Sequence, residues 1–555
     1  MNEGKPLGKD AGDDVFTVDE AIEACGFGWF QVRLSVFAGL IWVVDAMEIM
    51  LLAVLGPAAR CEYNLTAVEE GLITTSVFIG NFLGAGVWGA LMDRYGRKKG
   101  LFVVCIFVCT MGLLSAFSFS YWYLLLTRGL IGFGISGGAQ AVTFYSEFLP
   151  AKQRAYCLLL IQVFFAMGTL FEVILALVVM VYANLGWHYL LGFTTVPLFL
   201  DLFAFWLVPE SARFYVASGE MKKARAVLEK VARTNKKSLP PGRLVSDKER
   251  TREWLVTAST SKGNPKKKMT ANGAYIGGDL DGIAGGDLSD DYDDYDDSEK
   301  IRLISKPKEE EDYKKSRGNL KDLFASRELK ITTCLLWFIW FGAAFGYYGI
   351  VLLTTEMLEI IKDLTARNLT DGTFMPCHDF SLASNMTNET KCSPLVTEDY
   401  LHMLWTTSAE LPGILLTAFI IERIGRKKTM AAEFAGCIIG FFLMYICPVD
   451  KYLLMFFVFL VRGLVTGAFQ AAYVYTPEVY PTSMRAIGLG MCSTVARLGS
   501  MSTPFIAQVL TRKSLRGTEG TYAGVFFLAG ICSLLLPIET KGKRMKDVVK
   551  INRKT

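Results

Sequence analysis

Histidine is almost absent from this sequence, which contains three among its 555 residues. His188, His378 and His402 are scattered along the chain, and no cluster with the ligand spacing of a metal site accompanies them. The sequence also lacks the G-x-x-x-x-G-K-[S/T] loop that cradles nucleotide phosphates. These absences disfavour a membrane enzyme and an ATP-driven pump, and we expect neither a metal nor a cofactor.

Charged residues are also scarce. They make up 20% of the chain, where a soluble protein carries about 25%, and hydrophobic residues reach 52%. The net charge of +4 is too small to indicate binding to nucleic acid. The N-terminus is polar and acidic and lacks the regions of a cleavable signal peptide. We therefore expect a membrane protein whose first apolar helix directs its insertion.

Long apolar segments recur twelve times, each near the roughly 20 residues that a spanning helix needs. They lie at 33–57, 71–92, 100–119, 122–146, 155–183, 187–208, 329–355, 400–421, 429–448, 452–476, 484–510 and 519–538. Six precede a long polar stretch and six follow it. The pattern predicts an all-α membrane protein with two six-helix bundles, at 33–208 and 329–538.

The two sets of six helices are copies of one unit. The basic loop Asp93–Lys99 returns as Glu422–Lys428, 329 residues later. Other pairs at nearly the same offset are Arg128-Gly129 with Arg462-Gly463, Glu147 and Arg154 with Glu478 and Arg485, and Pro209-Glu210-Ser211 with Pro537-Ile538-Glu539-Thr540. Membrane proteins built from two parallel repeats are mostly secondary transporters.

Basic residues are depleted from alternate loops, and cytosolic loops carry the excess of Lys and Arg. This rule assigns both termini to the cytosol. The segments expected there are 1–32, 209–328 and 539–555. The loop 357–399 is expected to be luminal or extracellular.

The loops expected to be luminal contain four glycosylation sequons of the form N-x-[S/T]. Their acceptors are Asn64, Asn368, Asn385 and Asn388. Cys377 and Cys392 share one of these loops and are candidates for a disulfide in an oxidising compartment. Cys61 is on the same side, so the pairing stays open.

The polar stretch divides into two parts. Residues 219–234 have the periodicity of an amphipathic helix. Residues 236–318 are too polar to form a core, and we expect them to be disordered. Within them, Glu299, Leu303 and Ile304 form an acidic-dileucine sequence of the kind that clathrin adaptors bind; a chance match is the alternative.

The loop motif Gly-x-x-x-Asp-Arg-x-Gly-Arg-Lys-Lys, from Gly89 to Lys99, resembles a signature of the major facilitator superfamily. The segments 209–214 and 537–542 are similar to its sugar-porter and organic-ion branch. The segments at 13–28, 335–341 and 470–482 resemble the synaptic vesicle 2-related family. The resemblance implies the major facilitator fold, secondary transport and a vesicle membrane.

Charges inside spans are informative because each costs about 2.5–3.5 kcal/mol at the bilayer centre on insertion scales. The residues predicted to form a substrate or proton site are Asp45, Glu48, Glu172, Glu410 and Arg497. Asp45 and Glu48 share one helix face and favour a cation or a proton. Arg497 is either their counter-charge or a contact for an anionic group.

Other residues of the spans have two interpretations each. Arg128 and Arg462 are related by the repeat and flanked by glycine, which favours a structural role; Asp201 is a further acid in the sixth span. Aromatic residues either line the cavity and stack on a cation or anchor the membrane interface. These residues are Trp42, Trp340, Tyr347, Tyr348, Tyr473 and Tyr475.

The repeated charges at the cytosolic side predict a gate. Its residues are Asp93, Arg94, Arg97, Glu147, Arg154, Arg423, Arg426, Glu478 and Arg485. Ion pairs among them would lock the halves together and break when the site opens inward. Anchoring by the positive-inside rule is the alternative, but it requires no glutamates.

We therefore predict a secondary transporter that moves a small organic ion across a synaptic or secretory vesicle membrane by alternating access. The expected partners are that ion, the bilayer and a clathrin adaptor. The alternative is a transporter-like protein that no longer transports and acts as a receptor, trafficking or regulatory partner.

Overall fold

The structure is a computed structural model, and it describes residues 15–246, 249–250, 320–366, 395–446, 451–481 and 484–541. Most of the stretch predicted to be disordered lies outside these residues. So do Asn368, Asn385, Asn388, Cys377, Cys392, Glu299, Leu303 and Ile304.

The chain divides into two compact units. One comprises Met1–Thr17 and Pro241–Gly318, and its described part contains two short parallel strands. These are β1 (Val15–Phe16) and β2 (Arg243–Leu244), with Val15 opposite Arg243 and Phe16 opposite Leu244. The other unit, Val18–Pro240 with Asn319–Thr555, contains all the helices discussed below.

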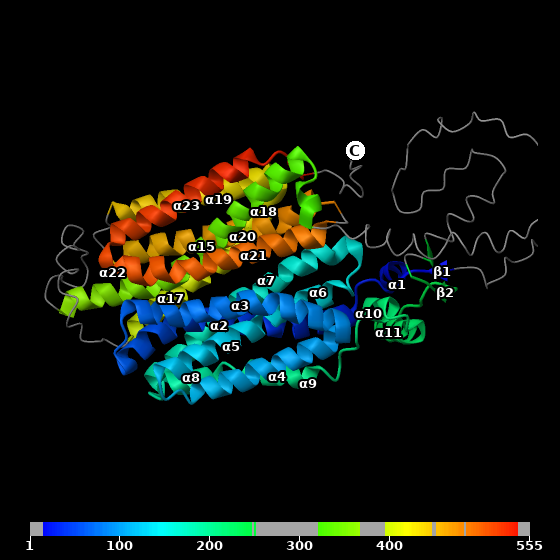
Figure 1. The fold of residues 1–555 in the computed structure, drawn as a ribbon, viewed down its shortest axis with the longest axis horizontal. Coiled ribbons are helices and arrows are strands. Elements are labelled where there is room, and N and C mark those ends of the chain that lie inside the picture. The colour runs from blue at the N-terminus through cyan, green and yellow to red at the C-terminus, as the bar shows by residue number, and fades with distance from the viewer. Residues whose placement is uncertain are drawn as a thin grey trace, which may run out of the picture. The chain divides into compact units, whose positions relative to one another are not determined.

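Helices of the second unit form two bundles that lie side by side (Figure 1). The first bundle consists of α2 (Trp29–Tyr63), α3 (Ala67–Tyr95), α4 (Arg97–Ala116), α5 (Tyr121–Gly138), α6 (Gln140–Ser146), α7 (Ala151–Ala176), the π-helical η1 (Leu177–Tyr182), α8 (Trp187–Phe193) and α9 (Val196–Ala204). The second consists of η2 (Leu320–Phe324), α15 (Arg327–Ala366), α17 (Thr397–Ser408), α18 (Glu410–Ile424), α19 (Arg426–Tyr445), α20 (Lys451–Val479), α21 (Arg485–Pro504), the π-helical η3 (Phe505–Leu510), α22 (Thr511–Lys513) and α23 (Leu515–Leu535). Each of the twelve predicted spans coincides with helix.

Nine helices among the described residues are long and apolar enough to cross a membrane as single helices. The predicted spans 122–146, 187–208 and 484–510 do not meet this criterion as single helices. The first two are divided, at Ala139 and at Thr194–Thr195. The third is long enough, but Gly, Ser, Thr and Arg residues lower its hydropathy.

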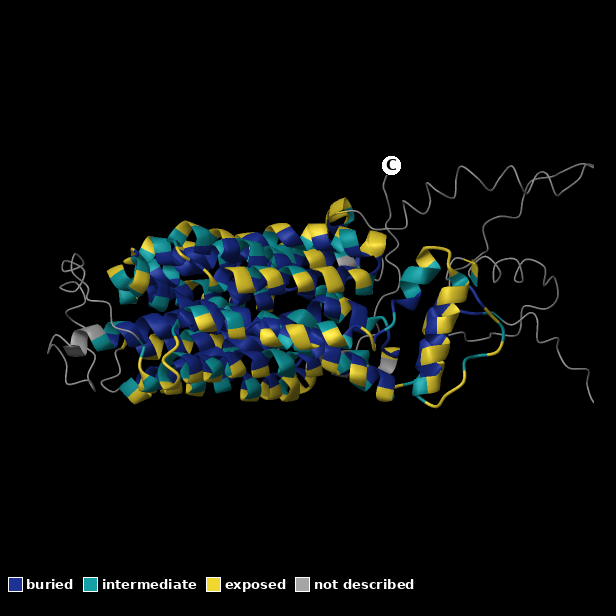
Figure 2. Ribbon diagram, turned by 90° about the horizontal axis from the view of Figure 1, so that it is seen from below, coloured by how far each residue is buried: buried dark blue, intermediate teal, exposed yellow. Residues whose placement is uncertain are grey.

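The surface of the bundles is apolar where a soluble protein would be polar. Figure 2 shows buried residues on the inner faces of the helices and exposed residues on the outer faces. Large exposed apolar side chains include Phe102, Leu160, Leu415, Phe442 and Phe527. Apolar surface on this scale suits contact with lipid rather than with water.

Three short helices lie at the end of the second unit that carries the basic loops: α1 (Val18–Cys25), α10 (Ala212–Ala217) and α11 (Met221–Thr234). α11 confirms the amphipathic helix predicted at 219–234. It buries Ala224, Val227, Leu228, Val231 and Ala232. Asn235 then fixes the start of α2, accepting from the backbone N–H of Phe30 at 3.0 Å and donating to Gln31 at 2.8 Å.

Candidate functional site

A central cavity lies between the two bundles, with about 940 Å³ of empty space including its mouth. Helices α2, α3, α5 and α7 line it from the first bundle and α15, α18, α20 and α21 from the second. Of the predicted site residues, Asp45, Glu410 and Arg497 line this cavity. Glu48 and Glu172 are not among its lining residues.

Asp45 and Arg497 are the charges that the cavity can use. Asp45 comes from α2 and Arg497 from α21, both are half-buried, and they interact electrostatically. Within the described part of the chain, neither has an ion-pair partner within 4 Å. One half thus contributes a negative charge and the other a positive charge to the same space.

Aromatic rings surround these two charges. Tyr347 and Tyr348 have ring centroids 5.2 Å apart, as do Phe469 and Tyr473. Trp42 lines the cavity as well. A cage of aromatic faces beside a carboxylate is suited to an organic cation. The interpretation as cavity residues therefore fits Trp42, Tyr347, Tyr348 and Tyr473.

Two other aromatic candidates have different roles. Trp340 is fully buried, and its indole N–H donates to the Thr476 hydroxyl at 2.9 Å. The Tyr475 hydroxyl donates to the Ile538 carbonyl at 2.6 Å. Neither lines the cavity, so both are packing residues of the second bundle.

Glu410 borders the cavity, but its charge is already paired. The guanidinium of Arg462 donates to Glu410 Oε1 at 2.8 and 3.0 Å, and the Tyr347 hydroxyl donates to the same oxygen at 3.1 Å. Thr169 of the first bundle donates to Oε2 at 3.2 Å. Glu410 therefore serves as a buried connection between the bundles.

Glu48 is held in a similar way within the first bundle, because the Arg128 guanidinium pairs with its carboxylate. Arg128 and Arg462, which the repeat relates, thus each pair with an acid of their own bundle.

Glu172 and Asp201 are buried, and within the described residues their carboxylate oxygens have no hydrogen-bond partner. These acids lie in the bundle interior rather than on the cavity wall.

The middle residue of each repeated basic loop is a glycine with a positive φ, a backbone conformation that other residues rarely adopt. Gly96 has φ +112° and Gly425 has φ +92°. A Cβ on Gly96 would come within 2.5 Å of Glu210 Oε2. That carboxylate accepts the backbone N–H of Lys98 at 2.9 Å and so caps the positive end of α4.

The same cap recurs in the second bundle, where Glu539 accepts the backbone N–H groups of Arg426 at 3.0 Å and Lys427 at 3.2 Å. The repeated Pro-Glu-Ser and Pro-Ile-Glu-Thr segments therefore have one structural function. Each carries a carboxylate back to the start of the helix that follows the basic loop.

The predicted gate residues form matching networks, one in each bundle. Arg97 pairs with Asp93 at 2.7 Å and with Glu147 at 3.6 Å. Its counterpart Arg426 pairs with Glu422 and with Glu478, each at 3.0 Å.

Hydroxyl groups complete these networks, since Ser211 donates to Glu147 and Thr540 donates to Glu478. Burial raises the pKa of Glu147 above its ordinary value. Because these pairs lie within one bundle, a lock between the bundles stays a prediction.

The remaining gate residues lie around these networks. Arg154 donates to the Leu149 carbonyl at 3.2 Å and interacts electrostatically with its counterpart Arg485. Arg94 lies over the Tyr95 ring and Arg423 over the Phe419 ring, with distances to the ring centroids of 5.5 and 3.7 Å.

The opposite end of the bundles, expected to be luminal, is described at Cys61 and Asn64. Cys61 is disulfide-bonded, which accords with an oxidising compartment. Asn64 is exposed in the turn after α2. Thr66 of the same sequon caps α3, with its side chain accepting from the Glu69 backbone N–H at 3.3 Å.

Five charged residues at this end were not among the predicted site residues. They are Arg60, Glu70, Glu356, Glu359 and Arg512, and they form a buried network between the bundles. The sequence does not single them out as site residues, because each lies near the end of an apolar segment, where charged residues are common. The available signal was the i, i+3 spacing of Glu356 and Glu359 at the end of one span.

A metal site is not found in the described part of the chain, which holds no group of three or more His, Cys, Asp or Glu residues able to bind one.

Comparison with protein families gives two matches. Residues 35–262 match the model described as sugar (and other) transporter, and residues 399–550 match that of the major facilitator superfamily.

Comparison with solved structures gives the same fold. The xylose transporter XylE from E. coli, in a partially occluded inward-open conformation, matches with a TM-score of 0.60. The match covers 93% of this chain and 99% of that chain at 14% identity.

Relatives of known name cover nearly the whole chain. Putative transporter svop-1 of Caenorhabditis elegans is 42% identical, over 98% of this chain and 90% of the relative. Synaptic vesicle 2-related protein of Xenopus laevis is 41% identical, over 96% and 83%. Organic cation/carnitine transporter 7 of Arabidopsis thaliana is 34% identical, over 98% of both. The chain therefore belongs to the major facilitator superfamily of membrane transporters and, within it, to the family of the synaptic vesicle 2-related proteins.

Proposed function

We propose that this protein moves a small organic ion with a positively charged group across a vesicle membrane by alternating access. One observation carries the proposal: Asp45 and Arg497 project unpaired opposite charges into a cavity between the bundles. Charges inside a membrane protein are costly to retain, and neither of these two has an ion-pair partner within 4 Å among the described residues.

The chemistry of the cavity favours a particular kind of ion. Asp45 and the rings of Tyr348 and Tyr473 suit an ammonium group. Arg497 suits a carboxylate, because its guanidinium presents several donors. A zwitterion with both groups satisfies both ends of the cavity. The Arabidopsis relative is named an organic cation/carnitine transporter, and carnitine has this combination of groups.

The arrangement of the bundles supports alternating access. Substrate sites of such transporters lie at the interface between repeats, which rock around them. Four helices of each bundle line the cavity here. Proton coupling is part of the proposal, through Asp45 or the buried acids Glu48 and Glu410.

Vesicle location and topology are further parts of the proposal. The names of the relatives support a vesicle membrane, and the distribution of basic loops supports cytosolic termini. We also propose that a clathrin adaptor binds Glu299, Leu303 and Ile304 and sorts the protein to the vesicle membrane. A receptor or regulatory function without transport is the competing proposal, and it gives no reason for the charges of Asp45 and Arg497.

Binding of carnitine to the purified protein tests the proposed site. Asp45→Asn removes the charge and keeps the size, so we expect Kd to rise at least about tenfold, which corresponds to 1.4 kcal/mol. Arg497→Ala should weaken binding similarly, while Arg497→Lys should restore part of it. Calorimetry at pH 5.5 and 7.5 measures all three variants.

Glu220→Gln is the matched control, because Glu220 is an exposed carboxylate that pairs with Lys223 outside the cavity. Its Kd should equal that of the unaltered protein. If Asp45→Asn binds carnitine with unchanged Kd and pH dependence, Asp45 is not in the site. If binding survives in Arg497→Ala, the substrate is a simple cation rather than a zwitterion.

A further inference from the structure

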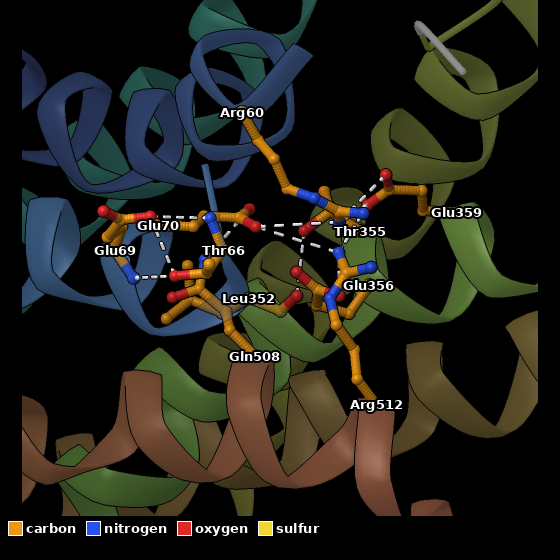
Figure 3. Close-up of polar contacts among 10 residues, drawn as sticks. All are labelled: Arg60, Thr66, Glu69, Glu70, Leu352, Thr355, Glu356, Glu359, Gln508 and Arg512. Atoms are coloured by element: carbon orange, nitrogen blue, oxygen red, sulfur yellow. Dashed lines mark hydrogen bonds and ion pairs between the residues drawn. The ribbon is translucent and has the colours of Figure 1, made fainter. Parts of the chain in front are cut away.

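Five charged side chains from the two bundles come together in one cluster (Figure 3). The cluster lies at the end of the bundles opposite the basic loops. We call it the luminal-end cluster. Its members are Arg60 at the end of α2, Glu70 at the start of α3, Glu356 and Glu359 on α15, and Arg512 on α22. Two residues therefore come from the first bundle and three from the second.

Ion pairs of this cluster cross the interface in both directions. Arg60 of the first bundle lies 3.2 Å from Glu359 of the second. Arg512 of the second bundle lies 3.8 Å from Glu70 of the first, and 2.7 and 2.8 Å from Glu356 and Glu359. These contacts join the two bundles at this end, and they must separate if the bundles are to part there.

The cluster is deeply buried. Glu70 is 0% exposed, Glu356 1% and Glu359 5%. Apolar side chains of the same helices belong to the surrounding core, including Leu55, Ala59, Leu352 and Met357. In such an environment an uncompensated charge is far more costly than in water.

The cluster has one negative charge in excess when all its groups are ionised, because three carboxylates face two guanidinium groups. The excess belongs to Glu70 and Glu356. Glu359 accepts hydrogen bonds from Arg60 and Arg512. Glu70, by contrast, is 3.8 Å from each arginine, and neither oxygen of Glu356 has a hydrogen-bond donor among the described residues.

Gln508 of η3 also faces Glu70, and its amide donates to Glu70 Oε1 at 3.5 Å. Glu70 and Glu356 share one cationic neighbour, because Arg512 Nη2 lies 3.8 Å from Glu70 Oε2 and 2.7 Å from Glu356 Oε2. Two ionised carboxylates beside one guanidinium repel each other, whereas a carboxyl and a carboxylate can share one proton.

We propose that the luminal-end cluster is a proton-binding site, in which one proton shared by Glu70 and Glu356 stabilises the closed luminal end. The proton cancels the excess charge while the cluster is buried. When the bundles separate at this end, water solvates the carboxylates and the proton leaves to the lumen. The inference is independent of the substrate, because no part of the cluster lines the central cavity.

The direction of the pH effect follows from linkage. The closed form binds one more proton than the open form, so lowering the luminal pH shifts the equilibrium toward the closed form. One proton changes the ratio of open to closed protein by up to about tenfold per pH unit. An acidic lumen therefore holds the protein with its luminal end shut, and a neutral exterior releases it.

Spin-label distances across the luminal end test this proposal in the full chain. Val68 and Arg516 are exposed residues near this end, one in each bundle, and each is replaced by a labelled cysteine. Cys334 and Cys532, which are free and not fully buried, are replaced by serine. Double electron–electron resonance on protein in nanodiscs then measures the open fraction from pH 5 to 8, without any substrate.

In the unaltered cluster, the long-distance population should grow by at least about threefold between pH 5 and pH 8, within the limit that one proton sets. Glu70→Gln supplies a permanent neutral group, so its short distance should persist at every pH. Glu356→Gln should likewise keep the short distance at every pH. It provides the same test if Glu70→Gln folds poorly. Glu69→Gln is the matched control, because Glu69 is the neighbouring acid on α3 and faces solvent; it should keep the full pH response.

Two results would overturn the proposal. One is a distance distribution that does not change with pH in the unaltered cluster. The other is a pH response that survives unchanged in Glu70→Gln and Glu356→Gln.

Discussion

At the scale of single residues, the charges inside the bundles are of two kinds. Arg128 with Glu48 and Arg462 with Glu410 form closed pairs, each within one bundle. Removing one member of such a pair leaves a buried charge uncompensated, at a cost of about 3–5 kcal/mol. Asp45 and Arg497 are not paired in this way, so their charges remain for a substrate.

Gly96, in the middle of the first basic loop, gives a prediction at the scale of single residues. Gly96→Ala should destabilise the protein by about 1–3 kcal/mol, because alanine rarely adopts φ +112° and its Cβ would displace the Glu210 carboxylate that caps α4. Gly524→Ala is the control, since a Cβ there meets no atom within 4 Å. Thermal unfolding in detergent should show a lower midpoint for Gly96→Ala and no loss for Gly524→Ala. Equal midpoints would contradict the proposed role of the glycine.

The sequence reveals which residues are charged inside the membrane, but not which of them face the cavity. Asp45 and Glu48 are three positions apart, which separates them by about 60° around the helix. That rotation is enough to direct Asp45 into the cavity and Glu48 toward Arg128. The rotation of α2 is set by its packing against other helices, which a single sequence does not contain.

At the scale of helices, length and hydropathy locate all twelve segments but not their interruptions. The break at Ala139 directly follows Gly137-Gly138, but glycine recurs throughout this apolar segment, so the sequence alone does not locate the break. The helix ends at the basic loops are easier to predict, because repeated glycines and charges identify them twice. Even there, the sequence predicted contacts between the bundles, and the structure shows Arg97 and Arg426 paired within their own bundles.

The end of α6 gives a prediction at this scale. Burial raises the pKa of Glu147, while Ser211 and the nearby Arg97 and Arg213 partly offset this effect and Glu210 adds to it. Since the pKa is higher in the folded protein than in the unfolded chain, Glu147 favours folding at low pH. That contribution is lost as pH rises through the folded-state pKa.

Thermal unfolding between pH 5 and 8 checks this prediction. It compares the midpoint of the unaltered protein with that of Glu147→Gln. The midpoint of Glu147→Gln relative to the unaltered protein should rise with pH, because the variant has no carboxylate to ionise. A constant difference across this range would show that Glu147 keeps the same pKa in the folded and unfolded states.

At the scale of the whole molecule, two repeats enclose one cavity and differ in what they place there. The repeat itself is visible in the sequence, since Asp93–Lys99 and Glu422–Lys428 are identical at five of seven positions. The luminal-end cluster is not visible there, because Arg60 and Glu359 are 299 positions apart in the sequence. Only the packing of one bundle on the other brings them together.

Uptake into proteoliposomes tests the central claim, that a charged cavity between the bundles carries a small organic ion across the membrane. Radiolabelled carnitine is supplied outside, with and without an imposed pH gradient, to vesicles containing the unaltered protein or Asp45→Asn. The account predicts saturable uptake by the unaltered protein and at least about a tenfold loss in Asp45→Asn, equivalent to 1.4 kcal/mol. Uptake that is equal in the two preparations, or absent from both, would contradict it.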